Sequence, residues 1–596
     1  MKNGWERALR LRWAAVGRPS FFDNPFLKTY NPNADFKSNG GWMRILYIMS
    51  AVIALFSIAY RLYGRFLRSE FKVDNERTTP ARQVNDGVDY VPTRLPILLA
   101  QHFSSIAAAG PIVGPILAAL WFGWLPALLW IVLGNIFIGA AHDFANLMAS
   151  VRHKARSIAE VVKENMSQKA YFLFLLFIWL SLIYVIVAFT DLTASTFLSE
   201  TYGAGVASSS FLYLLLSVLL GLAITRGRFS LGSATALALP LLLLIIWGGQ
   251  KIPLSLPGWI ASNPAKGWDV IILTYCFFAS ILPLWILLQP RGYLGGYFLY
   301  ASLLVGIAGL LFGGFKAEYP AFIGFQNPKG APLFPILFIT VACGACSGFH
   351  GLVCSGTSSK QLEKEGDAQP IGYGGMLLEG MVAVIALATV MMIPLGDESL
   401  RRGPTEIYAG GLARFANLLG VPMEVAISFG LLAFATFVYD TLDVATRLGR
   451  YIFQELTGWQ SRSGRIGATF ATLALPLFFL MTTQEAAYLK FWPIFGASNQ
   501  LLAALSLLGI SVWLVKSGRN PVYTLLPMVF VLIMTLWALG LFIKPWFDGI
   551  ASGSFRPDLI GMVALILIGI AVLLLVEGYQ IMIRQKVSKR PAASPL

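Results

Sequence analysis

Charged side chains are scarce in this chain. Only 13% of its 596 residues are Asp, Glu, Lys or Arg, whereas 56% are hydrophobic and the mean hydropathy is +0.68. A soluble domain carries about 25% charged residues, so water is not the main solvent of this protein. The alternating strands of about ten residues that a membrane barrel needs are also missing. The composition therefore favours a membrane protein built of α-helices.

Cysteine is rare as well, and no leader is evident. All four cysteines, Cys276, Cys343, Cys346 and Cys354, fall in apolar runs. No disulfide framework is therefore predicted. The first 30 residues lack an apolar stretch followed by a small-residue cleavage site, so we expect no removable signal peptide.

Apolar runs of roughly 18 or more residues recur along the chain and are long enough to cross about 30 Å of hydrocarbon as helices. They predict an all-α polytopic membrane protein with about fifteen transmembrane helices. The predicted spans are 43–62, 95–120, 124–150, 170–191, 208–224, 232–249, 269–289, 297–315, 333–357, 371–394, 424–445, 465–482, 491–515, 522–543 and 559–582.

Basic residues lie in alternate loops between these runs. The formal net charge of +15 therefore indicates membrane topology and not nucleic-acid binding, because cytoplasmic loops are enriched in Lys and Arg. The basic positions assigned to such loops are Arg152, Lys154, Arg156, Arg226, Arg228, Arg291, Lys360, Lys364, Arg447, Arg450, Arg462, Arg465, Lys516, Arg519, Arg584, Lys586, Lys589 and Arg590. By this rule the C-terminal tail, 583–596, is cytoplasmic.

The N-terminal end gives conflicting signals. Counting backward puts loop 63–94 in the cytoplasm and the tail 1–42 outside, although this tail is itself basic. Either the segment 43–62 is peripheral and does not span, or the tail is exported despite its charge; we favour export.

Two spans, 95–120 and 333–357, cannot be regular helices, because Pro and clustered Gly interrupt the hydrogen-bond ladder. The interrupting residues are Gly110, Pro111, Gly114 and Pro115 in the first span and Gly344, Gly348, Gly351 and Gly356 in the second. The two spans run in opposite directions and lie seven spans apart. Residues 95–315 and 333–582 are therefore predicted to form inverted repeat halves.

Broken helices in secondary transporters expose half-helix amides to anions and free carbonyls to cations near the bilayer midplane. The two segments therefore nominate a substrate site. The alternative is that these small residues serve only close helix packing, as they often do in membranes.

Ionisable side chains at mid-bilayer are functional candidates, because each costs several kcal/mol, on the order of 3 or more, without a partner. The candidates for proton coupling are His102, Asp143, His350, Glu379 and Asp443. The alternative for each is a structural hydrogen bond between helices, and for Asp143 and Asp443 also a place at the headgroup interface.

Cys343, Cys346, His350 and Cys354 have offsets of three, seven and eleven and would share one face of an unbroken helix, as ligands of a soft metal. Four ligands along one rigid helix extend over roughly 16 Å, too far to converge on one ion. Only unwinding at the glycines would permit a metal site here, and the alternative is four small apolar side chains in the core.

Several long stretches resemble the carbon starvation protein A family. They are FKVDNERTTPARQVNDGVDYVPT (71–93), LLAQHFSSIAAAGPIVGPILAA (98–119), HDFANLMASVRHKARSIAEVV (142–162), CGACSGFHGLVCSGTSSKQL (343–362), YGGMLLEG (373–380), LDVATRLGRYIFQEL (442–456) and FWPIFGASNQLLAAL (491–505). The resemblance covers roughly residues 70 to 510.

This resemblance implies a bacterial cytoplasmic-membrane uptake system for peptides or pyruvate, driven by proton symport during carbon starvation. It also implies a LeuT-like core of the amino acid/polyamine/organocation superfamily, with five-plus-five inverted repeats. The substrate-binding residues predicted from the broken segments and the family motifs are His102, Ser104, Ser105, Gly110, Gly114, Ser347, His350, Ser355, Thr357 and Asn499. Family members often have small residues where this chain has Cys346 and Cys354, which weakens the metal hypothesis.

The leading hypothesis is proton-coupled import of a small carboxylate across the bilayer, with no cofactor, no nucleic-acid partner and no enzymatic activity. Sodium could replace the proton as coupling ion, and the oligomeric state stays open. One alternative is an intramembrane metalloenzyme that uses His102, His142, Asp143, His350 and the cysteines. Another is a nutrient sensor, although the chain contains no evident output domain.

Overall fold

The computed structural model describes residues 44–87, 90–225, 231–254, 256, 262–283, 286–483 and 487–588. Within these ranges the chain is helical and forms no β-strand beyond isolated bridges. The prediction of an all-α membrane protein is confirmed. The predicted N-terminal tail 1–42 and residues 589–596 of the C-terminal tail lie outside the described residues.

The first part of the chain contains thirteen described helices. They are α3 (Ile45–Glu70), α4 (Pro80–Val84), α5 (Leu95–Ile106), α6 (Gly110–Phe122), α7 (Trp124–Gly134), the π-helix η1 (Asn135–Gly139), α8 (Ala140–Arg152), α9 (Ile158–Asn165), α10 (Gln168–Phe197), α11 (Gly203–Thr225), α12 (Leu231–Gly249), α13 (Pro264–Ile281) and α14 (Leu288–Phe312).

The second part begins with the other interrupted span. Its helices are α15 (Leu333–Thr340), α16 (Ala342–Ala345), α17 (Gly348–Gly356), the 3₁₀-helices η2 (Ser358–Lys360) and η3 (Glu365–Asp367), the π-helix η4 (Gln369–Gly374), α18 (Gly375–Met391), the 3₁₀-helix η5 (Glu398–Arg401), α19 (Pro404–Asn417), α20 (Met423–Thr457), α21 (Arg462–Thr482), α22 (Ala487–Lys516), α23 (Val522–Ala551) and α24 (Leu559–Ser588).

Twelve helical spans are long and apolar enough to cross a membrane, and the bent pair α5 and α6 makes a thirteenth. Two of the twelve are runs of consecutive helices, α7 with η1 and α8 (Trp124–Arg152) and η3 with η4 and α18 (Glu365–Met391). The predicted span 269–289 corresponds to α13, which carries Lys266 and Asp269, and the predicted span 333–357 corresponds to three short helices. The predicted number of fifteen therefore stays a prediction. The predicted first span is longer than expected, because α3 continues to Glu70.

Both predicted spans are interrupted, but only at some of the predicted residues: Gly114 and Pro115 lie inside α6, and Gly351 lies inside α17. Helices α5 and α6 meet at an angle of 46° across residues 107–109, and Pro111 sits in the first turn of α6, where a missing N–H removes no helical bond. In the second segment Cys346 and Ser347 are extended between α16 and α17. Neither segment is an ordinary uninterrupted helix.

The two broken segments touch each other through glycine. A Cβ added at Gly110 would meet the side chain of Cys343, and one added at Gly114 would lie 2.5 Å from the carbonyl oxygen of Thr340 and 3.2 Å from Val341 Cα. These glycines are predicted substrate ligands, and the structure places them where α6 crosses the second broken segment. This crossing brings the two helix breaks to one level of the bundle.

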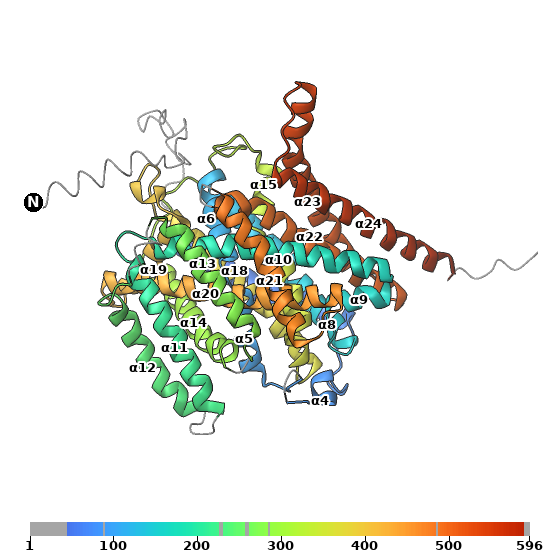
Figure 1. Ribbon diagram of the computed structural model, residues 1–596, viewed down its shortest axis with the longest axis horizontal. Coiled ribbons are helices and arrows are strands. Elements are labelled where there is room, and N and C mark those ends of the chain that lie inside the picture. Colours follow the sequence, from blue (N-terminus) through green and yellow to red (C-terminus); the bar gives the residue numbers. More distant parts are fainter. Residues whose placement is uncertain are drawn as a thin grey trace, which may run out of the picture.

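The other helices surround this crossing. Helix α6 packs on α18, α17 packs on α8, and the long helices α10 and α20 pack on each other. Helices α11 and α12 lie side by side at one edge of the molecule, whereas α23 and α24 lie at the opposite edge (Figure 1). The residues next to the breaks are therefore surrounded by protein, and His102 and His350 are at most 1% exposed.

Loop 71–94, predicted to be cytoplasmic, is fastened to the segment that follows α17. The buried Glu365 carboxylate accepts hydrogen bonds from Arg152 (2.9 and 2.8 Å), from Arg77 (3.3 Å) and from the backbone N–H of Asp74 (3.0 Å). Thr93 donates its N–H to the carbonyl of Gln361 at 3.0 Å. These bonds fix the loop between α3 and α5 to the segment that contains Gln361 and Glu365.

Three basic residues assigned to loops from the sequence are in fact inside the bundle. Arg291 lies in the first turn of α14 with no exposed surface, and Arg447 and Arg450 lie within α20 at 7% and 3% exposure. That assignment is wrong, because the flanking sequence does not reveal partners on a distant helix: Arg291 faces Asp443, and Arg447 donates to the carbonyls of Ala279 and Leu282.

The crossing of the broken segments makes a stability prediction. Gly114→Ala places a methyl group against the backbone of Thr340 and Val341, which cannot rotate away. We expect a loss of about 1–3 kcal/mol in unfolding free energy, as for other overpacked sites, and a lower midpoint of thermal unfolding in detergent. Gly569→Ala in α24 is the control, because nothing lies within 4 Å of the added Cβ. Equal midpoints for both variants would contradict the crossing.

Candidate functional site

Three of the four histidines of the chain and two carboxylates gather in one buried cluster next to the helix breaks. His102 comes from α5, His142 and Asp143 from α8, His350 from α17 and Glu379 from α18. Each is at most 1% exposed. The sequence placed all five inside the membrane, and the structure brings them together.

Asp143 is the centre of this cluster. Its Oδ1 lies 2.8 Å from Nδ1 of His142, and its Oδ2 lies 2.9 Å from Nδ1 of His350. An ionised carboxylate only accepts hydrogen bonds, so both ring nitrogens donate when Asp143 is ionised. One carboxylate therefore orients a histidine from its own helix and a histidine from the second broken segment.

His350 also faces Glu379. Its Nε2 lies 3.1 Å from Glu379 Oε2, which is an ion-pair distance, although the angle departs from that of a good hydrogen bond. Attraction at this contact requires a proton, either on the ring as imidazolium or on the Glu379 carboxyl. His350 thus lies between two carboxylates, Asp143 at one ring nitrogen and Glu379 at the other.

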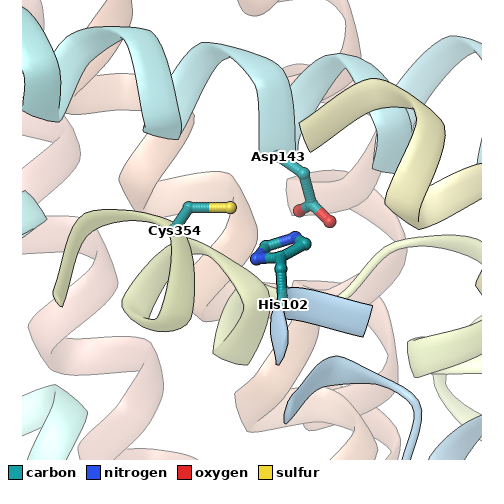
Figure 2. A group of neighbouring side chains, drawn as sticks. All are labelled: His102, Asp143 and Cys354. Carbon is teal, nitrogen blue, oxygen red and sulfur yellow. The ribbon is translucent and has the colours of Figure 1, made fainter. Parts of the chain in front are cut away.

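His102 completes the cluster from the first broken segment. Its Nδ1 lies 2.8 Å from the Ser358 hydroxyl, and its Nε2 is buried without a hydrogen-bond partner among the described residues. Figure 2 shows His102, Asp143 and Cys354 directed toward one another from three different helices. Ligand atoms of these three side chains lie within 4.8 Å of one another.

Both carboxylates follow a π-helical turn, a feature that the sequence did not reveal. Helix η1 ends at Gly139, four residues before Asp143, and η4 ends at Gly374, five residues before Glu379. A π-turn inserts an extra residue and rotates the helix that follows. Glycine makes the close packing possible, since a Cβ at Gly372 would lie 2.9 Å from the Cα of Phe144.

The predicted substrate residues of the second segment form a network around the start of α17. The Asn499 side chain accepts from the backbone N–H of Phe349 at 2.9 Å and donates to the Ser347 hydroxyl at 3.1 Å and to Cys343 Sγ at 3.2 Å. Asn499 thereby caps the half-helix from α22. The side-chain amide of Asn499 thus accepts the hydrogen bond from one of the free N–H groups that were predicted to bind substrate.

The other predicted hydroxyls bond to backbone. Ser355 donates to Gly351 and accepts from the N–H of Ile158 at the start of α9, while Thr357 bonds the carbonyl of Val353. On α5, Ser105 donates to Gln101, and Ser104 donates to the carbonyl of Gly292 on α14 at 3.3 Å. Ser104 is thus the predicted hydroxyl that reaches across to α14.

Asp443 belongs to a separate cluster. It accepts hydrogen bonds from Arg291 and, at 2.7 Å, from the Tyr275 hydroxyl, and Asp440 Oδ1 lies 3.4 Å from Arg291 Nε. Sequence reasoning missed Arg291 here. The one available signal was that RGYLGGY at 291–297 continues into an apolar run without a polar loop.

The predicted metal quartet is not the group that the structure assembles. Cys354 lies near His102 and Asp143, whereas Cys343 contacts Asn499 and belongs to α16, beyond the break that precedes α17. Both oxygens of Asp143 are already engaged by histidine nitrogens. Of the three grouped side chains, Asp143 and one nitrogen of His102 are therefore already engaged in hydrogen bonds.

Comparison with known proteins identifies related sequences over most of the chain. A family model described as carbon starvation protein CstA matches residues 44–400 and 395–538. The chain is 31% identical over 580 residues to the peptide transporter CstA of Campylobacter jejuni, covering 86% of this chain and 82% of that protein. It is 31% identical to the pyruvate/proton symporter BtsT of Escherichia coli K12, covering 84% and 82%.

Among solved structures, the manganese transporter of Eremococcus coleocola in complex with an aromatic bis-isothiourea compound aligns over 85% of this chain and 99% of its own, with 14% identity and a TM-score of 0.45. The peptide transporter CstA of Escherichia coli K12 is 32% identical over 583 residues, covering 84% of this chain and 81% of that protein. On the family match and these identities, the chain belongs to the carbon starvation protein CstA family.

Proposed function

We propose that this membrane protein is a secondary transporter that imports a small carboxylate, pyruvate or a short peptide, by proton symport across the bacterial cytoplasmic membrane. The observation that carries the proposal is the position of His350 between Asp143 and Glu379 at a break in a membrane helix. The names of two relatives, a pyruvate/proton symporter and a peptide transporter, support the same substrate class.

The proton would reside on the Asp143, His350 and Glu379 triad. If Asp143 is ionised, the ring donates from Nδ1, and the next proton lies either on Nε2 or on Glu379, 3.1 Å away. From the imidazolium, loss of the Nδ1 proton to Asp143, 2.9 Å away, gives a third state with the same number of protons. Through these three states a proton can pass across the imidazole between the carboxylates on α8 and α18.

Alternating access needs two bodies that move against each other. Helix contacts support a pairing of five helices with five: α5 packs on α14 as α15 packs on α22, α6 packs on α18 as α17 packs on α8, and α13 packs on α20 as α21 packs on α10. In this arrangement the hairpin of α11 and α12 is an insertion in the first repeat. That insertion accounts for the predicted spacing of seven spans in place of five.

The coupling role predicts a specific defect for Asp143→Asn. The amide keeps the shape of the side chain but cannot exchange a proton, so uptake driven by a pH gradient should fall to equal concentrations inside and outside. Exchange of labelled for unlabelled substrate should survive, because exchange needs no net proton movement. The measurement is uptake of labelled pyruvate and dialanine into proteoliposomes, with a proton gradient and with a sodium gradient.

His153→Gln is the matched control, because His153 is the one histidine outside the cluster and bonds the Ala149 carbonyl and Asn165. We expect wild-type accumulation from it. Wild-type accumulation by Asp143→Asn would reject the proton role of the cluster, and accumulation by the wild type under a sodium gradient alone would reject the proton as coupling ion.

A metal-binding function is the second candidate, because His102, Asp143 and Cys354 offer donor atoms within 4.8 Å. We expect less than one equivalent of zinc or iron in protein purified under mild conditions, since both Asp143 oxygens already accept hydrogen bonds from imidazole. Elemental analysis of the wild type beside Cys354→Ser checks this. One equivalent that is lost in the variant would favour the metal centre.

A further inference from the structure

A second group of buried charged side chains lies on the other side of α5. Arg291 on α14 faces Asp440 and Asp443 on α20, and all three are at most 8% exposed. One guanidinium therefore faces two carboxylates. The other groups around it are tyrosines from three helices, Tyr213, Tyr275 and Tyr439, with Cys276 on α13 and Arg447 further along α20.

The two carboxylates hold Arg291 unequally. Asp443 receives a hydrogen bond from Arg291 Nη1 and a second from Tyr275, so it is the permanent counter-ion. Asp440 lies 3.4 Å from Nε without forming a hydrogen bond to it. Arg447 gives no further compensation to Asp440, because it donates to the carbonyls of Ala279 and Leu282.

The edge of Arg291 that faces away from Asp443 forms no hydrogen bond to any residue that the structure describes, although Asp440 lies 3.4 Å from its Nε. Both Nε and Nη2 are buried without a hydrogen-bond partner among the described residues. These two N–H groups form the side-on fork by which arginine binds a carboxylate with two parallel hydrogen bonds. Two buried guanidinium donors without partners would be costly in a purely structural ion pair.

Three glycines, Gly292, Gly295 and Gly296, follow Arg291 on α14. A Cβ added at Gly292 would find only the Ser104 hydroxyl, at 3.9 Å, and one added at Gly296 would find nothing within 4 Å. A Cβ at Gly295 would lie 2.6 Å from Asp440 Oδ2, so only glycine at this position leaves space for the Asp440 carboxylate. Room therefore exists between α14 and α5, where Ser104 stands just before the break in the first broken segment.

We propose that the Nε and Nη2 edge of Arg291 is the receptor for the substrate carboxylate, and that Asp440 is the resident competitor that the substrate displaces. The inference rests on the proposed transport of small carboxylates and names the subsite that would recognise them. When the substrate carboxylate replaces Asp440 at Arg291 and Asp440 takes up a proton, the net charge of the cluster is unchanged. Binding of the acid anion is thereby tied to binding of a proton.

The test measures binding of pyruvate and dialanine to purified protein by calorimetry, with uncharged methyl pyruvate as the control ligand. Arg291→Lys keeps the charge but loses the fork, and we expect roughly 10- to 100-fold weaker binding of both acids, the range for a hydrogen bond to a charged group. Asp440→Asn removes the competitor while Arg291 and Asp443 stay paired. We expect tighter binding that varies less with pH than binding to the wild type.

Loss of Arg291 alone can unfold the protein, because Asp443 would be left unpaired. The double variant Arg291→Gln with Asp443→Asn removes both charges, and a structural pair predicts full recovery of folding and binding, whereas a receptor predicts recovery of folding only. Arg450→Gln is the matched control for loss of a buried guanidinium on α20 and should bind the acids as the wild type does.

Unchanged binding in the double variant, or unchanged and equally pH-dependent binding in Asp440→Asn, would overturn the receptor assignment while leaving transport itself intact. A wild type that neither binds nor transports the two acids would instead reject the proposed function. The two failures are therefore distinguishable by the behaviour of the wild type alone.

Discussion

An ionised side chain inside a membrane-spanning bundle needs a partner that neutralises it, and this constraint arranges the interior of the molecule. The chain meets it twice. In one cluster Asp143 is shared by His142 and His350, and in the other Arg291 is held by Asp443 and approached by Asp440. Both clusters draw their members from helices far apart in sequence, so they also fix which helices pack together.

The same constraint applies to the backbone where helices stop inside the bundle. Helix α17 begins in mid-span, and a side chain from α22, Asn499, accepts the hydrogen bond that a preceding helical turn would otherwise take. The first turn of helix α22 is capped in the same way by Asp191 of α10, whose carboxylate accepts a hydrogen bond from the N–H of Tyr488 at 2.8 Å. Side-chain caps of this kind satisfy the free backbone N–H group at a break without restoring a continuous helix. A rotation of one side chain therefore releases the N–H group again.

Local sequence patterns predicted those structural features that depend on a single segment of the chain. Apolar length predicted the helices, and Gly110-Pro111 and the glycines around Cys346 predicted that both spans are broken, because these effects act within one or two turns. Gly114-Pro115 did not break its helix, since α6 continues through it. The residue type alone was enough to select His102, Asp143, His350 and Glu379, since an ionisable group in an apolar run is rare. The structure brings these four together.

Features that depend on two distant segments were not accessible in this way. Arg291 was assigned to a loop, because its partners Asp440 and Asp443 lie about 150 residues further along the chain. The π-turns before Asp143 and Glu379 carry no glycine or proline pattern that differs from ordinary membrane packing. The metal quartet was drawn on one helix, whereas the break at Cys346 and Ser347 separates its members.

Helix α5 links the two clusters mechanically. His102 and Ser104 are two residues apart, and because successive residues of an α-helix are rotated by about 100°, their side chains leave the helix on nearly opposite sides. His102 bonds Ser358 at 2.8 Å beside Asp143, and Ser104 bonds the carbonyl of Gly292 at 3.3 Å beside Arg291. Helix α5 ends two residues later, at the break.

A half-helix that ends at a break can rotate or tilt without carrying the rest of its span, since no continuous hydrogen-bond ladder joins it to α6. Any rotation of α5 that widens the space beside Arg291 must move His102 relative to Ser358 and the Asp143 carboxylate. Admission of an anion on one face and a change in proton contacts on the other are then consequences of one rigid-body motion. Motion of α5 is therefore the simplest physical way in which anion binding at the Arg291 cluster and proton binding at the Asp143 cluster could change together.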